Sequence, residues 1–364
     1  MNRQPTPSVA SAATPGRVYE YYATCVSGLE EVVAQDLRRR LPGIQALRAE
    51  RGRRHGRLWF HYERSPRQLL DLRSVTNLFA AVARVTQVTT GRPGVVRVAE
   101  ALAVSDLSTA VALYGKLHGL EGVGVVRIVS TVTPNHRFSP AEVIRAASQA
   151  LPPPVAVTFG PGVQAPALHV TVEEHAAVCG LQLGRRRLRA RQYRHAAVGG
   201  GLDATVAYCM ALLAGIGSRT VCLDPMCGGG TLLVEGVQAF GARLGVGGDL
   251  SGQALDVARQ NVREAGAAVC LVRWDATHLP VRAGSVDALL CNLPFGKRVE
   301  ALARGHVPGV LAGTARVLRP GGRAVLLGHP QDLRAPVAPG LRQEQRLRLH
   351  LRGVDPVLVV LRRA

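Results

Sequence analysis

The sequence has almost no lysine and no long apolar run. Lys116 and Lys297 are its two lysines, so nearly all of the formal net charge of +20 comes from arginine. A GC-rich genome would explain arginine in place of lysine, but not 45 basic residues against 25 acidic ones. A chain this basic favours a polyanionic partner, nucleic acid before membrane. No apolar run approaches the roughly 18–20 residues of a membrane-spanning helix, so we expect no membrane partner.

The sequence also lacks a signal-peptide core and paired cysteines. Residues 1–16 contain no apolar stretch of that kind and are predicted to be a disordered tail. The seven cysteines are scattered, without a C-x-x-C pair, so a zinc site is unsupported and reduced thiols fit best. We expect a cytoplasmic protein that binds no metal.

Two small α+β modules are predicted in the front half. In residues 17–90, VYEYYATCV and RLWFHYE are predicted strands, whereas SGLEEVVAQDLRRRL and SPRQLLDLRSVTNLFAAV are predicted helices. In residues 91–183, GVVRIVSTVT is a predicted strand, and SPAEVIRAASQAL is a predicted helix with Ser139 as N-cap and Pro140 in its first position. PALHVTV and AAVCGLQL are typical of a β-hairpin.

A basic linker, residues 184–200, follows these modules. Six of the ten residues from 185 to 194 are arginine. A solvated linker is the simplest interpretation, and a track for RNA phosphates with a stacking tyrosine is the alternative. The candidate RNA-binding residues of this segment are Arg185, Arg186, Arg187, Arg189, Arg191 and Tyr193.

Residues 201–364 change to regular β–α alternation. Short apolar strands such as VCLD and SVDALLCN alternate with amphipathic helices, which predicts a doubly wound, mostly parallel sheet. The last two apolar segments, QRLRLHLRG and DPVLVVLRR, are predicted to pair antiparallel. The fold class is therefore α/β and Rossmann-like, preceded by the two α+β modules.

The loop LDPMCGGGT, residues 223–231, connects the first strand of this region to a helix. Its glycines allow close approach of a ligand to the helix N-terminus. A P-loop would need a lysine after the glycines, and a dinucleotide site would need a third glycine where Leu233 stands. Asp224 would repel a pyrophosphate. The spacing of Asp224, Gly228 and Gly230, with Met226 in the same loop, suits S-adenosylmethionine (SAM), which has an ammonium group and no phosphate.

Two further acids follow strand ends in the same region. Asp249 closes the second strand, where its carboxylate can accept from both ribose hydroxyls of a nucleoside. Asp275 follows the third strand and can accept a hydrogen bond from an adenine amino group. A lone acid is most often a surface residue, but three acids at successive strand ends lie on the face where such sheets bind ligands.

The sequence CNLPFGKR, residues 291–298, ends the fourth strand on that face. The oxygen of Asn292 and a backbone carbonyl, that of Leu293, could grip the two hydrogens of an exocyclic amine and aim its lone pair at a methyl donor. Pro294 would fix the turn and Phe295 would stack on an extruded base. A proline–aromatic turn that only packs is the alternative. The cations Lys297 and Arg298 behind the turn are further candidates for RNA binding.

With these motifs, the chain resembles the THUMP-domain guanosine-N2 RNA methyltransferases. The resemblance rests on DPMCGGGTLLVEG, GGDLSGQAL and WDATHLPVRAGSVDALLCNLPFGKR, and extends more loosely over YYATCVSGLEEVVAQDL and NHRFSPAEVIRAASQAL. It implies a ferredoxin-like domain over 17–90, a THUMP domain over 91–183, a linker over 184–200 and a SAM-dependent methyltransferase domain over 201–364. Relatives often carry aspartate at the position of Asn292, and either side chain offers the needed oxygen.

The resemblance implies methylation of a guanosine N2 amine, in the tRNA acceptor stem, with SAM as cofactor. The alternatives are the same chemistry on ribosomal or small nuclear RNA, or an RNA-binding protein without catalysis. A DNA adenine-N6 methylase is disfavoured because no DNA-recognition domain is recognisable. We expect a monomer, and an activator subunit only if the protein is eukaryotic.

Overall fold

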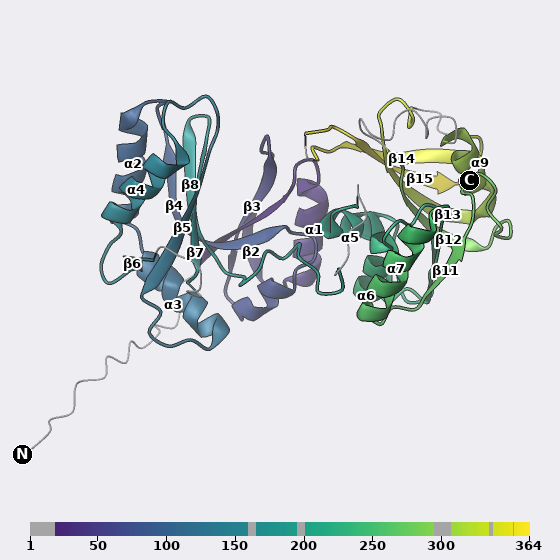
Figure 1. The fold of residues 1–364 in the computed structure, drawn as a ribbon, viewed down its shortest axis with the longest axis horizontal. Coiled ribbons are helices and arrows are strands. Elements are labelled where there is room, and N and C mark those ends of the chain that lie inside the picture. Colours follow the sequence, from purple (N-terminus) through teal and green to yellow (C-terminus); the bar gives the residue numbers. More distant parts are fainter. Residues whose placement is uncertain (1–18, 159–164, 195–200, 295–306, 335–337, 352) are drawn as a thin grey trace, which may run out of the picture.

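The computed structural model describes residues 19–158, 165–194, 201–294, 307–334, 338–351 and 353–364. It contains two β-sheets, one in the front half of the chain and one in the back half, with helices packed against both (Figure 1). Within these residues, none of the helices is both long enough and apolar enough to cross a bilayer.

The front sheet has eight strands in the order β2-β3-β1-β4-β8-β7-β5-β6. All neighbours pair antiparallel except β5, which is parallel to β7 and β6. The strands are β1 Glu20–Val26, β2 Ile44–Glu50, β3 His55–Tyr62, β4 Asn77–Thr86, β5 Val125–Val132, β6 Ala156–Val157, β7 Ala167–Glu173 and β8 Ala176–Gln182. The helices of this half are α1 Glu30–Arg40, α2 Arg92–Ala103, α3 Leu107–His118 and α4 Pro140–Ala150.

Strands from both sides of residue 90 therefore belong to one sheet, joined where β4 pairs with β8. Helix α1 lies between β3 and the back half, whereas α2 and α4 cover the other end of the sheet (Figure 1). The N-cap predicted for α4 is confirmed, because Ser139 and Glu142 form a reciprocal capping box there. The assignment of residues 17–90 and 91–183 to separate domains stays a prediction.

The helix predicted over residues 65–82 is wrong beyond its first turns. The chain forms a short 3-10 helix, Pro66–Asp71, and then enters strand β4, Asn77–Thr86. The neighbours Leu78 and Phe79, which point to opposite faces of the strand, are both buried. A strand covered on both faces has a continuous apolar sequence, which periodicity alone does not separate from a helix.

The back sheet has seven strands in the order β11-β10-β9-β12-β13-β15-β14. The first five are parallel and the last two pairings are antiparallel, which confirms the predicted mostly parallel, Rossmann-like sheet. The strands are β9 Val221–Asp224, β10 Leu244–Asp249, β11 Val269–Arg273, β12 Val286–Asn292, β13 Leu318–Gly328, β14 Leu341–Arg348 and β15 Val357–Arg363. The helices in the described part of this half are α5 Ala204–Leu213, α6 Thr231–Phe240, α7 Gly252–Ala265 and α9 Val307–Val317.

Candidate functional site

The strand order of the back sheet reverses between β9 and β12. From β9 the order runs to β10 and β11 on one side, and to β12 and β13 on the other. In open parallel sheets the crevice at the carboxyl ends of the strands beside such a reversal is where ligands bind. Asp224 ends β9, Asp249 ends β10 and Asn292 ends β12. The fold thus brings these three predicted site residues to one edge of the sheet.

Asp224 is a buried carboxyl group with an altered proton affinity. The residue is 1% exposed, and its Oδ1 accepts a hydrogen bond of 3.1 Å from the backbone N–H of Met226. The pKa of Asp224 is raised to about 8, chiefly by burial and in smaller part by the negative charge of Asp249, whereas the hydrogen bond from Met226 opposes the shift. A cation placed beside Asp224 would favour its charged form.

Asp249 connects the glycine loop to the start of helix α7, with one oxygen bonded to each. Its Oδ2 accepts a 2.9 Å hydrogen bond from the N–H of Gly228, and its Oδ1 accepts one of 2.9 Å from the N–H of Ser251. Gly228 has a φ of +50°, and a Cβ built on it would meet no atom within 4 Å. The loop therefore borders open space where a ligand can approach the backbone.

Two residues that were not predicted stabilise this loop by donating hydrogen bonds to its backbone carbonyls. Asn261 of α7 donates a 2.9 Å hydrogen bond from Nδ2 to the carbonyl of Gly229. Trp274 donates a 3.0 Å hydrogen bond from Nε1 to the carbonyl of Pro225, and its indole ring lies where a Cβ of Gly248 would be. No local pattern predicts that Asn261 faces the loop. Trp274 directly precedes Asp275 in the segment WDATHLPVR, and this neighbourhood was the one sequence signal that pointed to it.

The remaining predicted cofactor residues lie around the same loop. Gly230, with a φ of +77°, caps the N-terminus of α6. Met226 is half-buried in the loop. Asp275 is exposed after β11, and its Oδ1 accepts hydrogen bonds from the N–H and hydroxyl of Thr277. Its position at the next strand end along the sheet is compatible with the predicted contact to adenine.

Asn292 presents a buried oxygen without a partner. It is the last residue of β12, and among the described residues its Oδ1 accepts no hydrogen bond although solvent does not reach it. Leaving a buried acceptor unsatisfied costs about 1–3 kcal/mol. A hydrogen-bond donor on a bound substrate would satisfy this oxygen and so account for its lack of a partner within the described residues.

The turn after Asn292 is anchored to the neighbouring strand. Leu293 is fully buried, and its N–H donates a 2.8 Å hydrogen bond to the carbonyl of Leu327 in β13. Pro294 follows and is half-buried. The other predicted members of this turn, Phe295, Lys297 and Arg298, lie outside the described residues.

The linker divides into exposed and buried residues. Arg185, Arg186, Arg187 and Arg189 are exposed, so they stay candidates for RNA contact. The prediction that Tyr193 stacks on a base is wrong, because the residue is 4% exposed. The prediction that Arg191 contacts RNA is also wrong. Its side chain is 8% exposed and pairs with the fully buried Glu235 at 2.9 Å.

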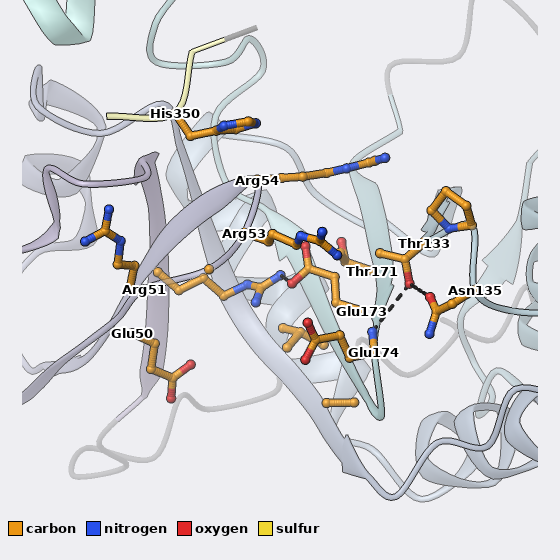
Figure 2. Close-up of a pocket in the computed structure, with 15 residues that line it drawn as sticks. Glu50, Arg51, Arg53, Arg54, Thr133, Asn135, Thr171, Glu173, Glu174 and His350 are labelled. Carbon is orange, nitrogen blue, oxygen red and sulfur yellow. Dashed lines mark hydrogen bonds and ion pairs between the residues drawn. The ribbon is translucent and has the colours of Figure 1, made fainter. Parts of the chain in front are cut away.

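A cleft lined by four arginines and three glutamates lies over the front sheet. It encloses about 880 Å³ and is lined from the β2–β3 turn, the loop after β5, the β7–β8 hairpin and the segment after β14. In Figure 2, the side chains of Arg53 and Arg54 extend from the β2–β3 turn in the direction of Thr133 and Asn135, with His350 beside them. Three segments of the front half and one of the back half thus meet around this space.

The charges of the cleft are only partly neutralised. Arg57 pairs with Glu173 at 2.8 Å, and the guanidinium of Arg51 donates to the carbonyl of Arg348 at 3.1 Å. Arg53 and Arg54 are exposed, and within the described part of the chain neither has an ionic or hydrogen-bonding partner. They were not predicted as RNA-binding residues, because RGRRH is too short to stand out in an arginine-rich chain.

The residues around the loop fit SAM. Its ammonium group can pair with the Asp224 carboxylate, its ribose can reach Asp249, and the open space beside Gly228 admits the methionine part. A phosphate-bearing cofactor does not fit, because Asp224 and Asp249 would repel it. The acceptor groups of the chain therefore match the ammonium and hydroxyl groups of SAM, at the place where the strand order of the sheet reverses.

Comparisons with known proteins agree with this geometry. Residues 191–337 match the family model of RMKL-like methyltransferase domains. A U6 snRNA (guanine-N(2))-methyltransferase from Mus musculus is 37% identical over 153 residues, which are 42% of this chain and 28% of that protein. The chain thus spans under a third of the length of that curated relative.

Longer matches come from Thermus thermophilus. A tRNA (guanine(6)-N2)-methyltransferase is 31% identical over 252 residues, 66% of this chain and 73% of that protein. The crystal structure of TrmN superposes with a TM-score of 0.75 and 27% identity, covering 95% of this chain and 99% of that one. On these grounds, the chain belongs to the THUMP-type RNA guanine-N2 methyltransferases.

Proposed function

We propose that the protein transfers the methyl group of SAM to the exocyclic N2 amine of a guanosine in RNA. The observation that carries the proposal is the buried Oδ1 of Asn292, which has no hydrogen-bond partner among the described residues and lies at the same edge of the sheet as Asp224 and Asp249. SAM supplies an electrophilic methyl group on its sulfonium. The protein has to present a nitrogen lone pair to that group.

Asn292 and Leu293 do this by hydrogen bonding. The amide oxygen of Asn292 and the carbonyl of Leu293 each accept one N–H of the amine, which turns the nitrogen from planar towards tetrahedral. The lone pair, otherwise delocalised into the ring, becomes available. The N–H of Leu293 bonds β13, and this contact fixes the direction of the turn. No strong base is needed, because the proton can leave after methyl transfer.

A tRNA is the favoured substrate. The Thermus thermophilus relative, of which this chain covers 73%, is named for guanine 6 of tRNA, and a nucleotide so near the 5′ end lies in the acceptor stem. The mouse relative named for U6 snRNA is matched over only 28% of its length. We further propose that the protein acts in the cytoplasm and as a monomer, with an activator subunit only if it is eukaryotic.

The decisive experiment offers SAM with unmodified tRNA, U6 snRNA and ribosomal RNA transcripts to the purified protein, each RNA separately. Nucleoside mass spectrometry should detect N2-methylguanosine in tRNA. Methylation of either other RNA instead would move the substrate and keep the chemistry. Methyl groups on adenine or on protein, or SAM binding without any transfer, would contradict the proposal.

The Asp224 carboxyl should make the stability of the free protein depend on pH. The folded state keeps this proton up to a pKa of about 8, whereas an unfolded chain releases it near the ordinary value of 3.8. The folded state therefore binds more protons between these values, and stability falls as the pH rises through this range.

Binding of SAM should show the opposite trend. The ammonium group pairs with the charged form of Asp224, so binding below pH 8 releases a proton and strengthens as the pH rises. Calorimetry should give an affinity that rises by up to about tenfold per pH unit between about pH 6 and 8. Asp224→Asn, which has no proton to release, should remove this dependence. An affinity of the natural protein that stays constant over this range would contradict the prediction.

The cleft arginines should supply part of the RNA affinity. If Arg53 and Arg54 bind phosphates, the double variant Arg53→Ala/Arg54→Ala should lower the slope of log affinity against log salt by about 0.7–0.9 for each phosphate that is no longer bound. Filter binding of tRNA at several salt concentrations measures this slope. Arg259→Ala, at an exposed position on α7, is the matched control and should change nothing. A double variant with an unchanged slope would exclude the cleft from the RNA path.

A further inference from the structure

Glu235 is a fully buried carboxylate whose two oxygens accept four hydrogen bonds. Oε1 accepts from Nη2 of Arg73 at 2.8 Å, from Nε of Arg191 at 2.9 Å and from the hydroxyl of Tyr193 at 2.9 Å. Oε2 accepts from Nε of Arg73 at 2.9 Å, which makes the contact with Arg73 bidentate. Arg191 also donates to the carbonyl of Arg73 at 2.7 Å.

The partners of Glu235 come from different parts of the chain. Arg73 lies in the front half, just before β4 enters the front sheet, and Arg191 and Tyr193 lie in the linker. Glu235 itself lies in the second turn of α6, the helix whose N-cap is Gly230 of the cofactor loop. The cluster therefore connects the segment that leads into strand β4 of the front sheet to helix α6, which starts at the cofactor loop.

A second buried contact supports the same junction. Asp36 of α1 accepts hydrogen bonds from Arg40 at 3.1 Å and from the hydroxyl of Tyr208 in α5 at 2.8 Å. Helix α1 lies against α5 where the two halves meet (Figure 1). Apolar surfaces tolerate sliding, whereas bidentate and charge-assisted hydrogen bonds fix direction as well as distance. Two such clusters leave the halves little freedom to rotate against each other.

We propose that Glu235 is a positioning residue, which holds the RNA-binding front half at one orientation to the catalytic turn. The proposal rests on the proposed function, because the orientation matters only if RNA held at the front presents its guanosine to Asn292. The cluster then acts through geometry alone. RNA bound by the front half then presents one nucleotide to the methyl group. Neither RNA affinity nor SAM affinity depends on Glu235.

Glu235→Gln is the sharpest variant, because it keeps the shape and replaces one accepting oxygen with an amide that donates. We expect kcat for tRNA methylation to fall by about 10²-fold, the effect of misplacing a reacting group by about 1 Å. The KM for tRNA and the SAM affinity should stay as in the natural protein. Small-angle X-ray scattering should show a broader distribution of interatomic distances. Asp256→Asn makes the same chemical change at a 75% exposed side chain of α7 and should change none of these.

Two results would overturn the proposal: an unchanged kcat with unchanged scattering, or a loss of SAM binding with unchanged scattering, which would make Glu235 a support of the cofactor site only. If Glu235→Gln does not fold, Arg73→Met removes the bidentate partner at a side chain that is 25% exposed and gives the same comparison. If the natural protein methylates no RNA, the proposed function fails, and the scattering comparison still decides whether Glu235 fixes the orientation.

Discussion

Replacing Asn292 with alanine should lower the rate of methyl transfer by about 10²- to 10³-fold, the usual effect of removing one preorganised polar group from a reaction centre. The physical reason is that only one of the two amine hydrogens would still be held, so the lone pair stays delocalised in the base. Incorporation of labelled methyl groups into tRNA measures the rate. SAM binding should persist, because the contacts assigned to SAM lie on Asp224, Asp249 and the glycine loop.

The folding of this variant is an internal control. Because Oδ1 of Asn292 has no partner among the described residues, its removal takes away an unsatisfied buried group. The melting temperature should therefore not fall. Asn292→Asp keeps an accepting oxygen in the same position and should retain measurable activity. An alanine variant with the natural rate would show that this oxygen plays no part in the reaction.

Replacing Asp249 with alanine should weaken SAM binding by about 10²-fold or more. By the proposed role of Asp249, the variant could not accept the two charge-assisted hydrogen bonds from the ribose hydroxyls, each worth about 1.5–3 kcal/mol. Its removal also frees the N–H groups of Gly228 and Ser251, so the loop beneath the cofactor loses its fixed shape. Isothermal titration with SAM measures the affinity.

The control for Asp249 is the asparagine variant. Asp249→Asn keeps one accepting oxygen and can still hold Gly228, so its affinity should fall between those of the alanine variant and the natural protein. Thermal unfolding without SAM separates damage to the loop from loss of the ribose contact. If the alanine variant binds SAM as tightly as the natural protein, Asp249 is a loop-fixing residue only.

The back half was predictable because its signals are local. Short apolar strands, the Gly228–Gly230 turn and polar residues at strand ends are all contained in short windows, and the parallel sheet then places the strand ends together. Asp224, Asp249 and Asn292 reach one edge as expected. The orphaned oxygen of Asn292 could not be predicted, because it depends on how strands β12 and β13 pack.

The front half was less predictable because its decisive contacts are long-range. Residues 65–82 look helical alone, but residues 77–82 are part of strand β4, which is stabilised by pairing with β1 and β8 on either side. Arg191 and Tyr193 look like solvated linker residues, but both are buried because they hydrogen-bond Glu235, which lies more than 40 positions later. The cleft arginines belong to a site that four separate segments build.

The pairing of β4 with β8 has a consequence for how the front half folds. Residues 77–86 and 176–182 pair in the middle of the sheet, so the second edge of β4 has to wait for a partner about a hundred residues later, whereas β1, β2 and β3 find their partners within residues 20–86. Such non-local closure is slow, and until it occurs the unpaired backbone of β4 is open to other chains. A chain cut near residue 90 would retain that open edge permanently. We therefore expect a nascent chain that holds only the first four strands to expose the backbone edge of β4 until β8 has been synthesised.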